Sequence, residues 1–335
     1  MSKQYVLKPF EKKMLYFLDR DSSMNLKELA KKLNTSPQRV DYTIRKLLNF
    51  GIIKELITII DYKKLGYTVG FVYYELKSMS SEKYEEMLDY CYNNEDILVI
   101  LEGIGEYDLS LGFFFKDLFE LNEKISEFKK RFNDHIYRDV KVVHIGARRS
   151  FRDYLFLSHE TEKGIQITTG GRETEVVYRD VDIKILSILS RNSRATISEI
   201  SKNICSNTYT VSKRIKYLKE NKIIVGATFV PDLKKYEYQY YRLLIKLKTV
   251  DELREKKFFS YLVSHPNVVQ AVKNFGEYSM TVDVEIEDIF KLREFTSLMI
   301  KNFGYLIDKY DIMRIYNIPK FCYFPSRLLK KVEKD

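Results

Sequence analysis

The feature that most constrains this chain is an internal repeat. A shift of 171 positions matches the sequence to itself for over a hundred residues without a gap. The matching positions include Val40 with Val211, Ile44 with Ile215, Leu47 with Leu218, and Gly105-Glu106-Tyr107 with Gly276-Glu277-Tyr278. A repeat of this length, kept without insertions, indicates the duplication of one structural unit. The chain is therefore predicted to hold two copies of the same domain pair.

Each copy begins with a predicted winged helix-turn-helix domain. Within residues 35–48, Ser36 suits the N-cap, Pro37 suits the first helical position, and the repeated apolar residues lie on one stripe. A capped helix over residues 25–33 comes before it, and the short join between the two helices leaves room only for a tight turn. Residues 52–60 form a β-branched run that predicts the strand pair of a wing. The second copy repeats this pattern with an asparagine cap.

The outward faces of the two second helices are candidates for reading DNA. They carry hydrogen-bonding and cationic groups, which suit base edges and phosphates in a major groove, although a solvated helix would look similar. The residues predicted to contact DNA are Ser36, Gln38, Arg39, Asp41, Tyr42, Arg45 and Lys46 in the first copy and Tyr209, Thr210, Ser212, Lys213 and Lys216 in the second. Arg214 is expected on the same outward face. Because these faces differ between the copies, the two heads should prefer different half-sites.

Positive charge is concentrated in the two predicted heads. Residues 1–60 carry 12 Lys and Arg against 6 Asp and Glu, and residues 176–231 carry 10 against 4, so each head has a net charge of +6. The whole chain has a net charge of +10, which leaves −2 for all other residues. This distribution suits the release of counterions from DNA phosphates.

The segment after each head alternates in the order β-α-β-β-α-β, which predicts a ferredoxin-like module and an α+β fold class. One face of such a sheet stays exposed unless another sheet covers it, so the modules are expected to pair. The predicted units are a winged helix-turn-helix over 1–62, a ferredoxin-like ligand and dimerisation domain over 63–147, a linker with a β-hairpin over 148–177, a second winged helix-turn-helix over 178–233, a second ferredoxin-like domain over 234–319, and a tail over 320–335.

Composition and cysteine usage exclude several classes of protein. Of 335 residues, 45% are hydrophobic and 31% charged, as in a folded multi-domain protein. No apolar run approaches the roughly 18 residues of a membrane span, and no signal peptide is evident, so we expect a cytoplasmic protein with no membrane partner. The three cysteines and four histidines have no disulfide or metal-ligand spacing. We expect no metal, no cofactor, no catalytic residue and no enzyme activity.

Five sequence stretches resemble the Lrp/AsnC (leucine-responsive, feast/famine) family of transcription regulators. They are SPQRVDYTIRKLLNFGIIK with IDYKKLGY in the first copy, TVSKRIKYLKENKIIVG in the second, and the turns GEYDLSL and GEYSMTV. The tandem arrangement, with ITTGGRE in the linker and Tyr323-Phe324-Pro325 in the tail, is similar to the double Lrp-like proteins of archaea. The resemblance implies DNA binding through the helix after the turn, dimerisation through the ferredoxin-like module, and amino-acid effectors bound between modules.

The resemblance also points to the two glycine-containing turns as effector-binding candidates. These residues are Gly105, Glu106, Tyr107, Asp108, Gly276, Glu277 and Tyr278. Asp108 is replaced by Ser279 in the second copy, so a pocket built from both turns would be lopsided. The alternative for each glycine is a tight turn that needs a positive φ angle.

The predicted function is a sequence-specific regulator that binds double-stranded DNA with two non-identical heads on one chain, modulated by an amino-acid effector. The two modules either pair within the chain as a pseudo-dimer or pair between chains as a homodimer with four heads. A rival function is a chromosome-architecture protein that binds DNA without sequence preference. A further rival is an enzyme, because the Lrp-like architecture also occurs in sirohaem decarboxylases; clusters of Arg with His, expected for such an enzyme, are not evident.

Overall fold

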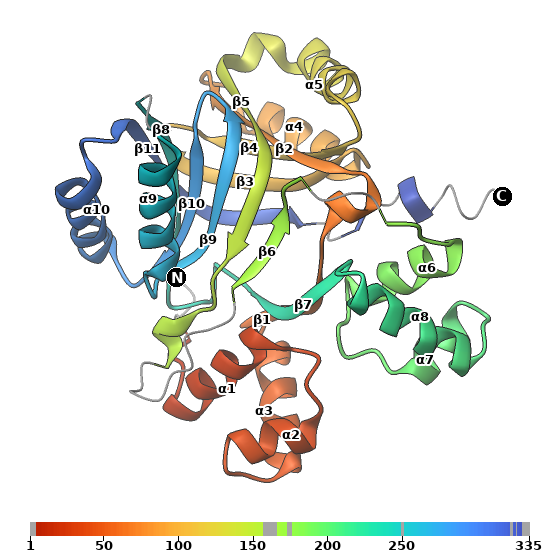
Figure 1. Cartoon of the computed structure of the whole chain (residues 1–335). Coiled ribbons are helices and arrows are strands. Elements are labelled where there is room, and N and C mark those ends of the chain that lie inside the picture. Colours follow the sequence, from red (N-terminus) through yellow and green to blue (C-terminus); the bar gives the residue numbers. More distant parts are fainter. Residues whose placement is uncertain are drawn as a thin grey trace.

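The computed structural model describes residues 5–156, 166–172, 176–248, 251–321, 324–325 and 327–329. Two helical heads lie below and beside a large β-structure, as Figure 1 shows. Head 1 consists of α1 (Pro9–Arg20), α2 (Leu26–Lys32) and α3 (Pro37–Asn49), and head 2 consists of α6 (Asp180–Leu189), α7 (Ile197–Asn203) and α8 (Thr208–Glu220). Among the described residues, no helix is long and apolar enough to cross a membrane.

The helix-turn-helix of each head is built as the sequence predicts. Ser36 Oγ accepts the N–H of Arg39 at 3.3 Å and so caps α3, and Asn207 Oδ1 accepts the N–H of Thr210 at 2.7 Å and caps α8. The preceding turns contain Asn34 and Cys205 at φ +49° and +51°. These two residues are 171 positions apart, so both copies make the same left-handed turn.

The wing differs from the prediction. Residues 53–60 form the single strand β1 (Ile53–Ile60), which pairs in antiparallel register with β7 (Ile224–Pro231) of the other copy. The strand pair predicted from this run is therefore wrong, because residues 53–60 hold no Gly, Pro or Asn that could turn a hairpin. Near this two-stranded ribbon, Ser22 Oγ lies 2.7 Å from Ser193 Oγ. A contact between residues 171 positions apart marks a pseudo-twofold axis.

Each head is followed by a β-α-β-β-α-β module, as the sequence predicts. The first module contains β2 (Thr68–Leu76), α4 (Ser81–Asn93), β3 (Ile97–Gly105), β4 (Leu109–Phe115), α5 (Leu118–Phe132) and β5 (Ile136–Arg149). The second contains β8 (Gln239–Leu247), α9 (Glu252–Ser264), β9 (Val268–Gly276), β10 (Met280–Ile286), α10 (Ile289–Phe303) and β11 (Ile307–Phe321). The fold class is therefore α+β, with two winged helix-turn-helix domains and two ferredoxin-like domains.

The two modules close on each other within one chain. Their strands follow the order β2-β4-β3-β11-β8-β10-β9-β5, and a further pairing between β5 and β2 completes a ring of eight strands. The modules meet at β3 with β11 and at β5 with β9, so each module's edge strands are paired by the other module. A buried apolar cluster that includes Tyr73, Tyr107, Leu244 and Tyr278 is shared by both modules.

The strand in the segment between the copies pairs with β5 and not with a second strand of the same segment. The described half of the predicted hairpin forms β6 (Ile167–Gly170), which pairs with β5 at Gly146 and Gly170; residues 173–175 lie outside the described residues. Just after β5, Tyr154 is buried against head 1, and the tail residue Phe324 is buried against head 2. Each head thus packs against an aromatic side chain that follows a module, Tyr154 for head 1 and Phe324 for head 2. The domain boundaries given above stay predictions.

Candidate functional site

The outward face of α3 is open to solvent. Gln38, Arg39, Tyr42 and Arg45 are exposed, and 69% of Tyr42 is accessible. The guanidinium of Arg39 lies 4.3 Å from the ring centroid of Phe10 on α1. This cation–π contact holds the Arg39 side chain against α1. Such a face presents donors and an aromatic ring at the surface where a helix meets the major groove.

Four of the residues predicted in and before α3 have side chains with partners inside the protein. Lys46 Nζ lies 2.7 Å from the buried carboxylate of Glu11, and hydrogen bonds to Glu11 and Tyr5 raise the pKa of Lys46. Asp41 pairs with Arg45 at 2.9 Å across one helical turn. Ser36 caps the helix. These contacts give structural roles to Lys46 and Ser36, and the role of each in DNA binding stays a prediction.

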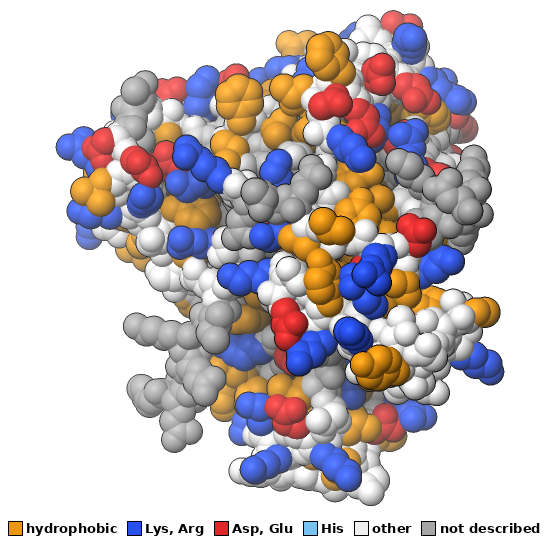
Figure 2. Space-filling view, turned by 45° about the vertical axis from the view of Figure 1, so that its right-hand side comes forward, with side chains coloured by type: hydrophobic (Ala, Val, Ile, Leu, Met, Phe, Trp, Pro, Cys, Tyr) orange, Lys and Arg blue, Asp and Glu red, His pale blue; other side chains and the backbone are white. Residues whose placement is uncertain are grey.

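The corresponding face of α8 presents a different set of side chains. Tyr209 is 75% accessible, Ser212, Lys213 and Lys216 are exposed, and Thr210 is partly buried. Figure 2 shows Lys and Arg side chains over the helical heads in the lower part of the view. Both predicted faces are therefore accessible, and they differ in chemistry.

Arg214 does not lie on the reading face where the sequence placed it. Its guanidinium donates to both carboxylate oxygens of Asp182, with Nε at 2.7 Å from Oδ1. Asp182 is fully buried at the start of α6. Arg214 therefore joins two helices of head 2, while Thr43, its counterpart in head 1, donates to the Arg39 carbonyl at 2.8 Å.

The two glycine-containing turns meet at the pseudo-twofold axis. Tyr107 and Tyr278 are buried, and their hydroxyl oxygens lie 2.6 Å apart. Asp108 accepts the backbone N–H of Leu76 at 2.8 Å, and Ser279 accepts that of Leu247 at 3.1 Å. The aspartate and the serine thus make the same local bond, so the exchange at this position does not make the turns lopsided.

The other residues of these turns also contact the protein itself. Glu106 pairs with Arg138, and Glu277 pairs with Lys246 at 2.8 Å. Gly105 and Gly276 have φ angles of +133° and +137°, and a side chain at either one would collide with a backbone carbonyl of the other module. Both glycines are needed for close approach of the modules, and effector binding at these turns stays a prediction.

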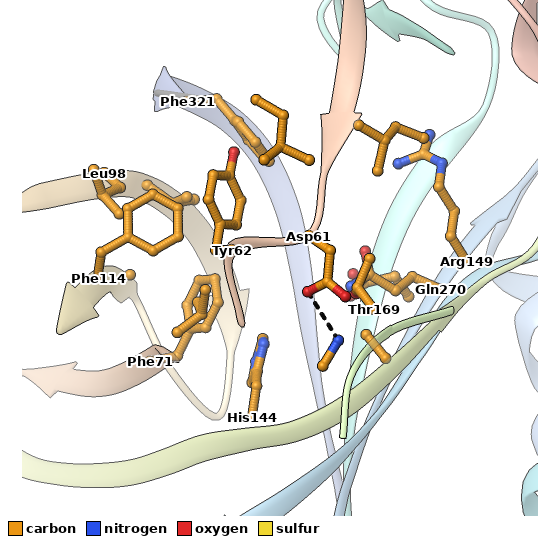
Figure 3. A pocket seen from close by; sticks show the side chains of 18 of the residues that line it. Asp61, Tyr62, Phe71, Leu98, Phe114, His144, Arg149, Thr169, Gln270 and Phe321 are labelled. Carbon is orange, nitrogen blue, oxygen red and sulfur yellow. Dashed lines mark hydrogen bonds between the residues drawn. The ribbon is translucent and has the colours of Figure 1, made fainter. Parts of the chain in front are cut away.

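A cavity of about 590 Å³ lies between the ribbon of β1 and β7 and the ring of strands. Figure 3 shows that its two sides differ: Leu98, Phe71, Phe114 and Tyr62 lie on one side, and Asp61, Arg149, Gln270 and Thr169 on the other. The rings of Tyr62 and Phe114 are 4.2 Å apart. The cavity is thus amphipathic, and the sequence analysis did not predict it.

His144 lies between the two sides of the cavity. Its ring stacks on Phe71 with centroids 5.0 Å apart, and its buried Nε2 has no hydrogen-bond partner among the described residues. Burial and the nearby charge of Arg242 lower the pKa of His144 to about 3. The imidazole is therefore neutral near pH 7, and its Nε2 is a buried nitrogen without a partner among the described residues.

Three guanidinium groups line the interior of the cavity, and each has a carboxylate partner. Arg242 donates to both oxygens of Asp283 at 2.6 and 2.8 Å, and Arg152 donates to both oxygens of Glu285 at 2.7 and 2.8 Å. Arg149 lies 3.7 Å from Asp19. The Nε of Arg149 is buried and has no partner among the described residues.

The charged lining residues carry a signal that the sequence analysis overlooked. Arg242, Asp283 and Glu285 stand in buried strands of the second copy, where the first copy has Phe71, Gly112 and Phe114 at the matching positions. Charged residues in otherwise apolar strands are rarely buried without a specific partner. Comparing the two copies position by position would have marked these residues as belonging to a polar site.

Two relatives found by sequence each match no more than about one copy of the unit. Residues 7–54 match the family described as winged helix-turn-helix DNA-binding. An uncharacterised HTH-type transcriptional regulator of Pyrococcus furiosus is 30% identical over 142 residues, covering 42% of this chain and 94% of that protein. The HTH-type transcriptional regulator LrpC of Bacillus subtilis is 33% identical over 82 residues, covering 22% of this chain and 57% of LrpC.

A solved structure matches the whole chain. The sirohaem decarboxylase NirDL covers 98% of this chain and 99% of its own, with a TM-score of 0.63 and 14% sequence identity. At this identity the likeness shows the fold alone. The prediction of no enzyme activity is overturned as an exclusion, because an enzyme shares this architecture from end to end and the fold is therefore compatible with enzyme activity.

Proposed function

Because this chain belongs to the Lrp/AsnC family of HTH-type transcription regulators, we propose that it binds DNA sequence-specifically with two non-identical heads presented by one chain. The observation that carries this proposal is the pairing of β1 with β7, together with the closed ring of strands. Both heads are held in a pseudo-twofold arrangement that a single-copy protein reaches only by dimerisation. The DNA-binding unit then forms without a concentration-dependent step.

The difference between the two reading faces supports an asymmetric target. Arg39 and Gln38 on α3 correspond to Thr210 and Tyr209 on α8, so donors of one head stand where the other has a hydroxyl or an aromatic ring. Arginine and glutamine are the side chains that pair with guanine and adenine edges in the major groove. Two such faces on one rigid unit favour a site with two unlike halves.

This proposal is tested by selecting DNA from a randomised duplex library with the purified chain at two salt concentrations. We expect a two-part motif that survives the higher salt. The substitution Arg39→Ala should relax one half of the motif and Lys213→Ala the other, each weakening its own half about tenfold or more, as expected for a lost base contact. Arg39 and Lys213 both lie on exposed faces.

The matched control is Lys256→Ala, because Lys256 is an exposed side chain of α9 and lies away from both heads. It should leave both halves of the motif unchanged. Strong binding that collapses with salt and enriches no motif would contradict the proposal, and the rival role in chromosome architecture would take its place.

Modulation by a small molecule is part of the proposal. The family resemblance implies an amino-acid effector between the modules, and the Tyr107–Tyr278 contact lies where the two modules meet. The polar groups of both turns already have partners within the protein. An effector at the turns would therefore have to replace existing bonds, whereas one in the cavity would meet free groups.

NirDL has also been solved in complex with an iron-uroporphyrin III analogue, and the cavity of this chain can be compared with what such a ligand requires. A uroporphyrin is a polycarboxylate, and carboxylates bound inside a protein need unpaired cations. Here the guanidinium groups of Arg149, Arg152 and Arg242 all lie beside carboxylates. His144 offers one neutral nitrogen, but the cavity does not fit a polyanionic macrocycle.

A further inference from the structure

The walls of the cavity favour a flat aromatic body. Tyr62 and Phe114 form one ring pair, and Phe71 with His144 forms a second. Gly112 lies beside these rings, where a side chain would come within 2.9 to 3.0 Å of Phe71 and Val99. Offset stacking against such rings stabilises a planar ligand beyond the burial of its area. A volume of about 590 Å³ accommodates one molecule of drug or cofactor size.

The charges of the cavity exclude a strong preference for anions. Its interior is lined by three guanidinium groups and three carboxylates, which sum to zero: Arg149, Arg152, Arg242, Asp61, Asp283 and Glu285. The remaining charged lining residues are exposed or partly buried and leave one excess positive charge: Lys63, Lys116 and Asp117. An anion in the interior would be desolvated without an unpaired cation, which is costly. A ligand without net negative charge avoids this cost.

Two free polar atoms define what the ligand must offer. The Nε of Arg149 is a donor and the Nε2 of His144 is a neutral ring nitrogen, and both are buried without a partner among the described residues. Eight buried side-chain atoms lack a partner among the described residues, and only these two belong to residues that line the cavity. A carbonyl, hydroxyl or ring nitrogen on the ligand would satisfy them once the two side chains turn toward the cavity, because neither atom has accessible surface in the present arrangement.

One wall of the cavity is bonded directly to head 1. Arg149 Nη2 donates to Thr228 Oγ1 at 3.2 Å, and that hydroxyl donates to Asp19 Oδ1 at 2.7 Å. Asp19 belongs to α1 and is fully buried, and it also accepts two bonds from Arg152. A ligand that holds Arg149 therefore acts on the residues that attach α1 to the ring.

Head 2 lacks this connection. The position that matches Asp19 is Ser190, whose hydroxyl donates to the carbonyl of Ser187 within the same head at 2.9 Å. The two copies have thus diverged at this position. Among the described residues, head 1 has the charged Asp19 here and head 2 has the uncharged Ser190. Occupancy of the cavity should affect the two heads unequally.

We propose that the cavity is a regulatory site for a planar aromatic molecule without net negative charge, and that its occupancy is transmitted to head 1 and not to head 2. That this site regulates DNA binding rests on the proposed function, whereas the binding of the ligand to the cavity does not. The ligand stacks between the ring pairs, takes a hydrogen bond from Arg149, and thereby stiffens the attachment of α1 through Asp19.

The binding site is tested by fluorescence titration of the full chain with two probes that share one aromatic body. N-phenyl-1-naphthylamine is neutral, and 8-anilinonaphthalene-1-sulfonate carries a sulfonate. We expect saturable binding of one neutral molecule per chain and about tenfold weaker binding of the sulfonate, because its charge would be buried without an unpaired cation. Equal or tighter binding of the sulfonate would overturn the assigned ligand class.

Two neighbouring residues of β6 provide a matched pair of variants. Thr169 lines the cavity, while Thr168 is exposed on the opposite face of the same strand. Thr169→Phe should reduce neutral-probe binding about tenfold or more by filling the cavity, and Thr168→Phe should not change it. Gln270→Phe, on β9, is a second filling variant in case the first fails to fold. Loss of binding in Thr168→Phe as well, or in none of the three, would overturn the location.

Transmission to head 1 is measured by hydrogen exchange of the same chain without DNA. Saturation with 6-propionyl-2-(dimethylamino)naphthalene, a neutral naphthalene whose carbonyl can accept a hydrogen bond from Arg149, should slow exchange in α1 at least about threefold and leave α6 unchanged, because only α1 is anchored through Asp19. Equal changes in both helices, or no change in α1, would contradict the transmission. Since no DNA is present, a failed proposal of DNA binding cannot be confused with a failure here.

Discussion

Replacing Arg152 by methionine is expected to destabilise the chain by about 3 to 5 kcal/mol, the usual cost of removing one partner from a buried ion pair. The Arg152 side chain is 5% exposed and holds two carboxylates that have no exposure, those of Asp19 and Glu285. Its guanidinium and backbone N–H donate four hydrogen bonds to them, between 2.5 and 2.8 Å. Methionine fills similar space but leaves both carboxylates without this partner. Urea unfolding followed by circular dichroism measures the loss.

The control for Arg152→Met is Arg45→Met, which removes an ion pair of a different kind. The Arg45 side chain is 74% exposed and pairs with Asp41 along one helix. Exposed pairs contribute about 0 to 1 kcal/mol, so this variant should unfold at nearly the same urea concentration as the natural chain. Similar losses in both variants would contradict the idea that the Arg152 cluster anchors head 1.

Gly276→Ala should destabilise the chain by about 3 kcal/mol or more, through both backbone strain and a collision. Gly276 has a φ angle of +137°, and a β-carbon would collide with the Lys141 carbonyl on β5. This is the point where β9 of the second module pairs with β5 of the first. The substitution therefore acts on the closure of the ring, and thermal or urea unfolding should show it directly.

Gly171→Ala separates the two causes in the same chain. Gly171 also has a positive φ angle, +94°, but nothing lies within 4 Å of the position of a β-carbon. Only the backbone strain remains, so we expect a loss of about 1 kcal/mol. If the two alanine variants unfolded alike, close approach of the modules would not be what fixes the glycine at position 276.

The sequence predicted what depends on local pattern and on the repeat. The caps Ser36 and Asn207, the apolar stripes and the β-α-β-β-α-β order all follow from short-range spacing, and each was found in the structure. The pairing of β1 with β7 did not follow, because a β-branched run shows that a strand forms and not which strand it meets. Its partner lies in the other copy, far along the chain.

The cavity could not be located from spacing for the same reason. His144, Arg149 and Arg242 lie on strands that come together only when the ring closes. Tyr107 and Tyr278 were singled out correctly as a matched pair, but their contact at the axis depends on how the modules face each other. The exclusion of an enzyme was wrong because it relied on the spacing of histidines and cysteines, and sites of this kind are assembled by tertiary structure.

The central claim is that one chain presents both heads as a single DNA-binding unit. Sedimentation velocity of the chain with a duplex that carries both selected half-sites, combined with footprinting of the same mixture, tests it most directly. We expect complexes of one chain and one duplex in which both halves are protected, at chain concentrations where no free dimer sediments. Protection of both halves only in complexes that contain two chains would contradict it.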